Sequence, residues 1–370
     1  MDEDSLAAMD DVLHSMYTLE NQVKLSKSPG ESMQNGGSLA TASSAENANA
    51  SPENGNLLSL ETFWSQFLPL VQLVSKEATT FSMAFQSAPY PHGDGVRHLC
   101  QALQKAVVST VAVYFHFLPV SKLEFGTLLW EEIRTGLCDI LNCVKNFIIA
   151  VKSPSNDRQA RQQLQTTGTV WEACDKFETH LARDNRQALL RKLASSLSLV
   201  DDVIRELGSS AAEESGASTD DVKLVYGSVS GLLKAGKATL LKIRAVLSSE
   251  RAQIAQPRGG SGGKSVLLET GKVHFALCTQ ASLDVIGQRI DGFSSGADEL
   301  AMTYYDVSEG ERNLAPVLEE GEKWTALVRS AITEFRVAPW FKENEDRERL
   351  DFIEKALAHN LEQLKKASLA

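Results

Sequence analysis

The stretch that decides the fold reads LETFWSQFLPLVQLVSKEATTFSMAF and spans residues 60–85. Its apolar side chains recur at steps of three and four: Leu60, Phe63, Trp64, Phe67, Leu70, Val71, Val74, Ala78, Phe81 and Phe85. This spacing predicts one face of a helix, because 3.6 residues complete a turn. Pro69 predicts a kink in that helix, since proline lacks a backbone donor and crowds the preceding turn.

The same periodicity continues along the chain. Pro119 is expected to stop the helix that follows. One segment is ambiguous, because Val273, Phe275 and Leu277 alternate as in a strand. The apolar pattern around them has the length of a helix, so a helix is expected there. The further helices are expected over residues 94–118, 121–151, 170–177, 184–207, 222–254, 265–308, 314–337 and 341–369.

Each long helix carries a stripe of large apolar side chains that water would solvate poorly. Burying one such side chain is worth roughly 1.5–3 kcal/mol, whereas helix propensities differ by less than about 1 kcal/mol per residue. Packing against neighbouring helices therefore contributes more to the stability of each helix than its propensity does. The sequence predicts an all-α protein with two packed antiparallel helical bundles of long amphipathic helices.

Composition divides the chain into four parts. Residues 1–56 are expected to form an acidic, largely disordered N-terminal tail, because most of them are small or polar. Residues 57–207 and 220–370 are expected to form the two bundles, joined by a Ser-, Ala-, Glu- and Gly-rich linker at 208–219. Within the tail, residues 5–24 show helical apolar spacing, which fits either a docked amphipathic helix or a transient helix without function.

Charge and apolar content disfavour several classes of protein. The 370 residues are 43% apolar and 23% charged with a net charge of −11, which suits a soluble globular protein and disfavours direct nucleic-acid binding. The most apolar stretch, residues 106–120, is shorter than the roughly 18–20 residues that a bilayer requires, and the acidic N-terminus is unlike a secretory signal. No membrane partner is expected.

The five cysteines point to reduced thiols. They are odd in number and include no C-x-x-C pair, so neither a disulfide framework nor a zinc ribbon is indicated. This usage predicts a cytoplasmic and nuclear location. The cysteines stand at positions 100, 138, 143, 174 and 278.

Candidate catalytic motifs fail on spacing. GGSGGKS at 259–265 resembles a phosphate-binding loop, but the required first glycine is Arg258, and the segment follows a helix instead of a strand; an interhelical linker explains it. His274 with Cys278, or His98 with Cys100, offers two metal ligands where a site needs more. The sequence therefore predicts no enzyme, no cofactor and no metal, and an enzyme alternative would require nucleotide binding that depends on Lys264.

The remaining candidates are pairs of acids and a basic helix face. Two neighbouring pairs, Asp201 with Asp202 and Glu319 with Glu320, fall on helix faces that are expected to be solvated. Lys234, Lys237 and Arg244 share one side of a helix that follows an acidic segment. They fit either a partner-docking face or an intramolecular complement to that segment. The acidic residues of the segment are Asp201, Asp202, Glu206, Glu213, Glu214, Asp220 and Asp221.

Several short pieces, in order, resemble the cyclin-D-binding protein family, also described as maternal Id-like helix-loop-helix proteins. They include Phe63-Trp64, VSKEATTF at 74–81 and VWEAC at 170–174. The others are Val113 to Phe115 with the Leu118-Pro119 stop, Arg183 to Asn185, LLKAGKATLLKIR at 232–244 and Asp298 to Ala301. The chain departs from animal members in its long Ser- and Asn-rich tail, a short acidic stretch at 211–221 and a charged ending after Trp340.

The resemblance implies a helical regulatory adaptor without catalytic activity. Its expected partners are proteins, namely D-type cyclins and helix-loop-helix transcription factors, and its expected effect is negative regulation of cell-cycle progression and of those factors. A helical-bundle scaffold of the vinculin or catenin kind is the alternative, because it shares long amphipathic bundles. The residues that bind a partner and the oligomeric state stay open.

Overall fold

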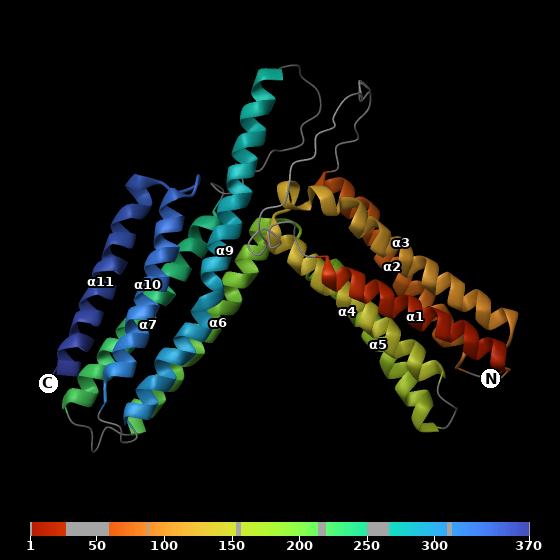
Figure 1. The fold of residues 1–370 in the computed structure, drawn as a ribbon, viewed down its shortest axis with the longest axis horizontal. Coiled ribbons are helices and arrows are strands. Elements are labelled where there is room, and N and C mark those ends of the chain that lie inside the picture. The colour runs from red at the N-terminus through yellow and green to blue at the C-terminus, as the bar shows by residue number, and fades with distance from the viewer. Residues whose placement is uncertain are drawn as a thin grey trace, which may run out of the picture. The chain divides into compact units, whose positions relative to one another are not determined.

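Ten α-helices make up the described part of the protein. The computed structural model describes residues 2–26, 59–86, 89–152, 157–213, 220–249, 266–308 and 313–369. Within these ranges there is no strand (Figure 1), so the prediction of an all-α fold is confirmed. Among the described helices, none combines the length and apolarity that a membrane crossing requires. The chain divides into two compact units, Met1–Asp184 and Asn185–Ala370.

The first unit contains five helices: α1 (Glu3–Leu25), α2 (Leu60–Ala84), α3 (Asp94–Glu124), α4 (Thr127–Lys152) and α5 (Asp157–Thr179). In this unit α2 packs against α3 and α5, α4 packs against α5, and α1 packs against α3 and α4. Figure 1 shows α1 running alongside α4, with α2 and α3 as neighbours of each other.

An aromatic cluster centres on Phe63 of α2. Its ring lies 4.8 Å from that of Phe67, 5.4 Å from that of Phe117 and 5.3 Å from that of Phe125, measured between ring centroids. All four rings are fully buried. Aromatic pairs at such distances stabilise a fold beyond the burial of their area, so this end of the unit is tightly held.

The second unit also contains five described helices: α6 (Asn185–Glu213), α7 (Asp220–Ser248), α9 (Val266–Ser308), α10 (Ala315–Val337) and α11 (Glu343–Leu369). The most extensive packing joins α9 to α10, α7 to α11 and α6 to α9. Gly236 of α7 lets the buried indole of Trp324 approach closely, and the Trp324 Nε1 donates to the Leu232 carbonyl at 2.9 Å.

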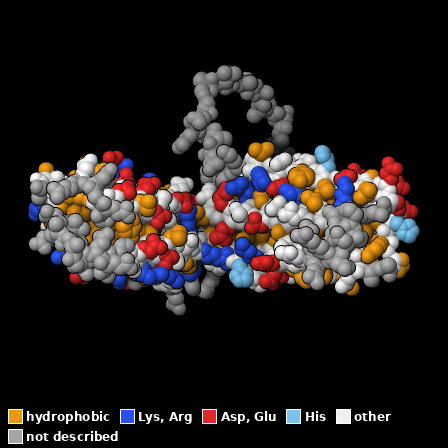
Figure 2. Space-filling model, turned by 90° about the horizontal axis from the view of Figure 1, so that it is seen from below, with side chains coloured by type: hydrophobic (Ala, Val, Ile, Leu, Met, Phe, Trp, Pro, Cys, Tyr) orange, Lys and Arg blue, Asp and Glu red, His pale blue; other side chains and the backbone are white. Residues whose placement is uncertain are grey.

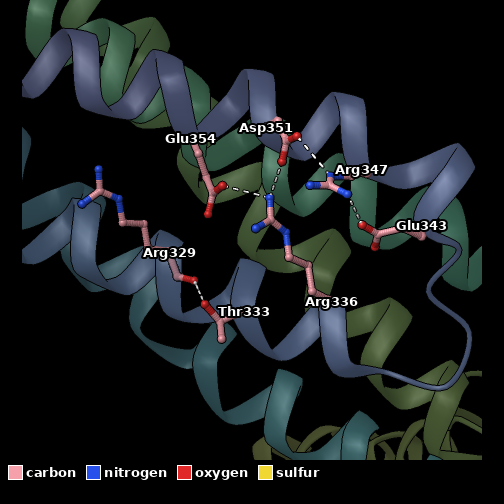
Figure 3. Close-up of polar contacts among 7 residues, drawn as sticks. All are labelled: Arg329, Thr333, Arg336, Glu343, Arg347, Asp351 and Glu354. Carbon is pink, nitrogen blue, oxygen red and sulfur yellow. Dashed lines mark hydrogen bonds and ion pairs between the residues drawn. The ribbon is translucent and has the colours of Figure 1, made fainter.

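Charged side chains fasten α10 to α11. Arg336 of α10 reaches Asp351 at 2.7 Å and Glu354 at 2.8 Å, both on α11. Figure 3 shows this arginine pointing between the two carboxylates, with Arg347 joining Asp351 to Glu343 along α11. The hydroxyl of Thr333 donates to the Arg329 carbonyl within α10. A network of this kind holds its members in place better than a single surface pair does.

The structure places the boundary between its units elsewhere than the sequence indicates. The predicted first bundle, 57–207, includes α6, but α6 lies in the second unit because its apolar stripe is buried against α7 and α9. The predicted linker 208–219 is shorter than expected, since α6 continues through Gly208 to Glu213. Within the predicted tail 1–56, α1 is a docked helix, and residues 27–58 lie outside the described part.

Like α6, the helices α3 and α5 are longer than predicted. Pro119 does not stop α3, which continues to Glu124. A proline removes only one backbone hydrogen bond, and both Pro119 in α3 and Pro69 within α2 are exposed, so the carbonyl that loses its partner can be hydrated. The polar segment before Val170 joins the predicted short helix in one continuous α5. The ambiguous alternation at 273–277 lies within α9 and is helical.

Candidate partner-binding surface

The residues proposed from sequence for chemistry are not brought together. GGSGGKS at 259–265 lies outside the described residues, as do the side chains of His274 and Cys278. On α3, His98 is exposed whereas Cys100 is buried, so these two side chains do not share an environment. Within the described ranges, no group of three or more His, Cys, Asp or Glu side chains is arranged to hold a metal ion.

The described cysteines are free and suited to packing. Burial raises the pKa of the Cys100 thiol to about 11 and that of the Cys174 thiol to about 12. Burial also raises the pKa of Cys138 and of Cys143. A thiol is nucleophilic only as the thiolate, so these four groups are poorly activated at neutral pH.

The paired acids lie in surface ion pairs. Asp201 of α6 pairs with Lys237 of α7, and Lys323 lies 2.8 Å from Glu319 and 2.7 Å from Glu320. For Lys237, the intramolecular interpretation of the basic helix face is therefore confirmed, whereas Lys234 and Arg244 are exposed. Figure 2 shows basic and acidic side chains interleaved on the visible face of the protein, as in an ordinary solvated surface.

The strongest candidate for partner binding is an exposed tryptophan on the first unit. Trp171 of α5 is 45% exposed, although its indole Nε1 donates to the Thr79 hydroxyl of α2 at 2.8 Å. The Thr79 hydroxyl in turn donates to the Ser75 carbonyl at 2.8 Å. The indole is thus held in one orientation while nearly half of its surface faces solvent.

Helix geometry explains why Trp171 lies at an edge. Thr167, Val170, Cys174 and Phe177 are buried and follow the three- and four-residue steps of a core stripe. Trp171 is one position beyond Val170, so it projects from the side of that stripe where α5 meets α2. The result is a large ring at the border between core and solvent.

Polar contacts give the register of α2 and α5. Gln72 of α2 donates to Glu178 of α5 at 3.2 Å, and Thr167 of α5 donates to Ser82 of α2 at 2.9 Å. Because rising numbers on α2 pair with falling numbers on α5, the two helices are antiparallel. In this register two more exposed apolar side chains, Met83 (66% exposed) and Leu164 (54% exposed), fall toward the same end of the pair.

We define the α2/α5 seam as a surface of six residues: Gln72, Thr79, Met83, Leu164, Trp171 and Glu178. It combines a tryptophan, two flexible apolar side chains and a polar pair at one end. Tryptophan is the residue type most enriched among those that dominate binding energies, and a preoriented ring loses little conformational freedom when a partner covers it. The seam is therefore suited to bind a protein surface.

Two pieces that carry the family resemblance meet in this seam. Thr79 belongs to VSKEATTF and Trp171 to VWEAC, which are separated by some ninety residues of sequence. Another such pair lies at the end of the unit, where the Trp64 Nε1 donates to the Arg183 carbonyl at 3.0 Å and the Arg183 guanidinium lies 4.7 Å from the Trp64 ring. The seam is not predictable from sequence patterns, because the exposure of Trp171 depends on where α2 lies.

Comparison with known proteins gives one family. Residues 66–213 match the model of the family described as "Grap2 and cyclin-D-interacting, N-terminal", a range that contains all six seam residues. The chain is 27% identical to "Cyclin-D1-binding protein 1 homolog" of Danio rerio over 340 residues, which cover 85% of this chain and 89% of the relative. It is 25% identical to the Xenopus laevis homolog over 334 residues, covering 85% and 91%. Human "Cyclin-D1-binding protein 1" is 26% identical over 153 residues, 41% of each chain.

Proposed function

We propose that this chain, which matches the Grap2 and cyclin-D-interacting family over residues 66–213, is a non-enzymatic adaptor that binds a D-type cyclin through the α2/α5 seam. The observation that carries the proposal is the position of Trp171, which is preoriented by Thr79 and half exposed inside the family-matched range. The relatives are named as binding proteins, and the described cysteines lack activation for nucleophilic chemistry.

The proposal extends to regulation and location. By binding the cyclin, the protein would lower cyclin-D-dependent phosphorylation of the retinoblastoma protein and so restrain cell-cycle progression, and it would also antagonise helix-loop-helix transcription factors. We propose that it works in the cytoplasm and the nucleus, where free thiols such as those of Cys100 and Cys138 stay reduced. Fractionation of cells that express the full chain, and a kinase assay with and without it, test these two statements.

The direct test measures cyclin binding by the full chain. We expect immobilised D-type cyclin to bind the wild-type protein, and Trp171→Ala to weaken the binding by about 30-fold, which corresponds to the roughly 2 kcal/mol of a dominant interface residue. Thr79→Val should weaken cyclin binding only a few-fold, because it removes the hydrogen bond that orients the Trp171 indole but keeps the indole on the surface. Leu199→Ala is the matched control, since Leu199 of α6 is 46% exposed and lies outside the seam.

The possible results separate the parts of the proposal. A Trp171→Ala protein with unchanged melting temperature and unchanged affinity would exclude the seam as the binding surface. A wild-type protein that binds cyclin no better than an unrelated helical bundle would exclude the cyclin assignment itself. Binding to actin or to an adhesion peptide, without cyclin binding, would favour the scaffold alternative.

A further inference from the structure

The N-terminal helix α1 lies in a groove that two other helices form. It packs closely against both α3 and α4, whereas α3 and α4 contact each other much less. Four of its apolar side chains, Met9, Val12, Met16 and Val23, are at most 1% exposed. Their spacing of three, four and seven residues forms a single stripe, and this stripe is covered along its whole length. Thus α1 occupies the α3/α4 groove as a peptide helix occupies a binding site.

Polar contacts fix the two ends of α1, one to Gly93, the residue before α3, and one to Tyr114 within α3. At its start, the backbone N–H of Gly93 donates to the Asp2 carboxylate and to the Ser5 hydroxyl, both at 3.1 Å. At its end, the hydroxyls of Ser26 and Tyr114 lie 2.8 Å apart. Residues 2 and 26 therefore align with residues 93 and 114, so α1 runs parallel to α3 with a defined register.

Opposite charges face each other between α1 and α4. Glu20 lies 2.6 Å from Lys145, and both side chains are largely buried, while Asp10 pairs with Lys152. Lys145 also covers the Tyr17 ring at 4.5 Å from its centroid. The groove thus offers an apolar floor and two lysines on one wall. Its complement is an amphipathic helix that carries carboxylates beside its apolar stripe.

The chemistry of Glu20 shows how well the contact is made. Burial alone would raise the pKa of this carboxyl, but hydrogen bonds from Lys145 and from Lys24 outweigh it and hold the pKa below its ordinary value. The charged form is therefore the one that the groove favours. Charge-assisted bonds of this kind add orientation as well as affinity, so a helix without the carboxylate would fit less well.

We propose that the α3/α4 groove is a binding site for an acidic amphipathic helix of another protein, and that α1 is the built-in competitor for that site. The partner helix presents apolar side chains at the spacing of Met9, Val12 and Met16, with a carboxylate one turn after the last of them, in the position of Glu20. A helix in trans binds only to the fraction of molecules from which α1 has left, so its apparent affinity is lowered by that fraction. This inference is independent of the α2/α5 seam.

The experiment uses the full chain and a labelled synthetic peptide of residues 2–26 as the probe helix. In a Val12→Asp/Met16→Asp variant, two carboxylates replace apolar side chains that are buried in the groove, so α1 cannot remain seated. We expect fluorescence anisotropy to show at least about tenfold tighter peptide binding by this variant than by the wild type. Thr18→Asp/Gln22→Asp adds the same charge on exposed positions of α1 and should leave peptide binding at the wild-type level.

A charge exchange tests the partner chemistry. A Glu20→Lys peptide should bind the Val12→Asp/Met16→Asp variant at least about tenfold more weakly, and Lys145→Glu in that variant should restore its binding. Equal peptide affinity for the wild type and the unseated variant would overturn the proposal, as would no binding to either protein. A concentration-dependent dimer that exchanges α1 between molecules would show that a second copy is the partner, which also contradicts it.

A measurement on the wild-type protein does not depend on the folding of any variant. If α1 leaves the groove as a separate unit, its amides should exchange with deuterium at least about tenfold faster than those in the buried turns of α3 and α4. Exchange of α1 at the same rate as α3 and α4 would mean that the groove opens only on global unfolding, and would refute a role for α1 as a competitor.

Discussion

Replacing Gly236 with alanine is the sharpest test of the packing in the second unit. A Cβ at this position of α7 would overlap Cζ2 of Trp324 and lie 3.0 Å from its Cε2. The indole cannot easily move away, because it is 1% exposed and donates to the Leu232 carbonyl of the same helix at 2.9 Å. Forcing an extra methyl into such a site costs about 1–3 kcal/mol.

Alanine also brings a gain that must be subtracted. It favours a helix over glycine by about 1 kcal/mol, so Gly236→Ala should lower the free energy of unfolding by a net of up to about 2 kcal/mol. Gly227 is the matched control, since it lies in the same helix and a Cβ there would meet no atom within 4 Å. Gly227→Ala should therefore raise the free energy of unfolding by about 0.5–1 kcal/mol.

The assay is urea unfolding of the full chain followed by circular dichroism, with the transition of each unit fitted separately if two are seen. The two substitutions are chemically identical, so their opposite signs isolate the contact with Trp324. Equal stability of the two variants, or a Gly236→Ala protein more stable than the wild type, would refute the close approach between α7 and α10.

Three further outcomes follow from burial and charge. Burial of Glu20 would raise its pKa, but hydrogen bonds from two lysines outweigh that effect and lower the pKa from 4.5. Its contribution to α1 docking is therefore full above pH 4.5 and is lost as pH falls through the lowered pKa. Lower protection of the α1 amides against hydrogen exchange, after correction for the intrinsic pH dependence of exchange, would reveal this loss. Cys100 and Cys174, whose pKa values are raised to about 11 and 12, should be alkylated at neutral pH at least about tenfold more slowly than in urea, as measured by mass spectrometry. Lys242→Met should lower the free energy of unfolding by about 3 kcal/mol, because it leaves the buried Asp346 carboxylate without the ammonium 2.6 Å away.

Each of these outcomes has a control. For α1, a Glu20→Gln protein should show a weaker pH dependence of exchange over the same range, and an unchanged dependence would contradict the assignment. Native alkylation of either buried cysteine as fast as in urea would contradict its burial. For the ion pair, Lys323→Met removes an exposed ammonium from the same unit and should lower the free energy of unfolding far less than Lys242→Met does. A comparable loss in both variants would refute the special cost of the buried pair.

The helices themselves were predictable from the sequence because their stripes are strong and local. The steps from Phe63 through Phe67 to Phe81 need no knowledge of any other element, and the structure confirms a helix there. Positions of breaks were less predictable. Pro119 carries the strongest stop signal of its region, yet α3 continues past it to Glu124. Pro119 lies on the exposed side of α3, where the loss of one backbone N–H donor has little effect.

Long-range features were beyond the reach of sequence patterns. The apolar spacing of Met9 and Met16 predicts an amphipathic helix, but whether it docks depends on α3 and α4, whose surfaces are formed by residues some hundred positions later. The boundary between the two units lies before Asn185, in a turn that contains neither glycine nor proline, so the sequence there does not indicate a boundary. The Gly- and Ser-rich composition of residues 208–219 instead predicts a linker at a different position. Exposure of Trp171 likewise depends on α2.

The position of the boundary before α6 matters to anyone who wishes to produce the family domain in isolation. A recombinant fragment trimmed to the matched residues 66–213 would retain α6 but lose α7 and α9. The apolar face of α6, which α7 and α9 cover in the full chain, would then be exposed to solvent. The same trimming would strip α1 from its groove. Such a fragment would expose two apolar surfaces, the α3/α4 groove and one face of α6, and we expect it to precipitate. A fragment that ends at Asp184 and retains the N-terminus should stay in solution.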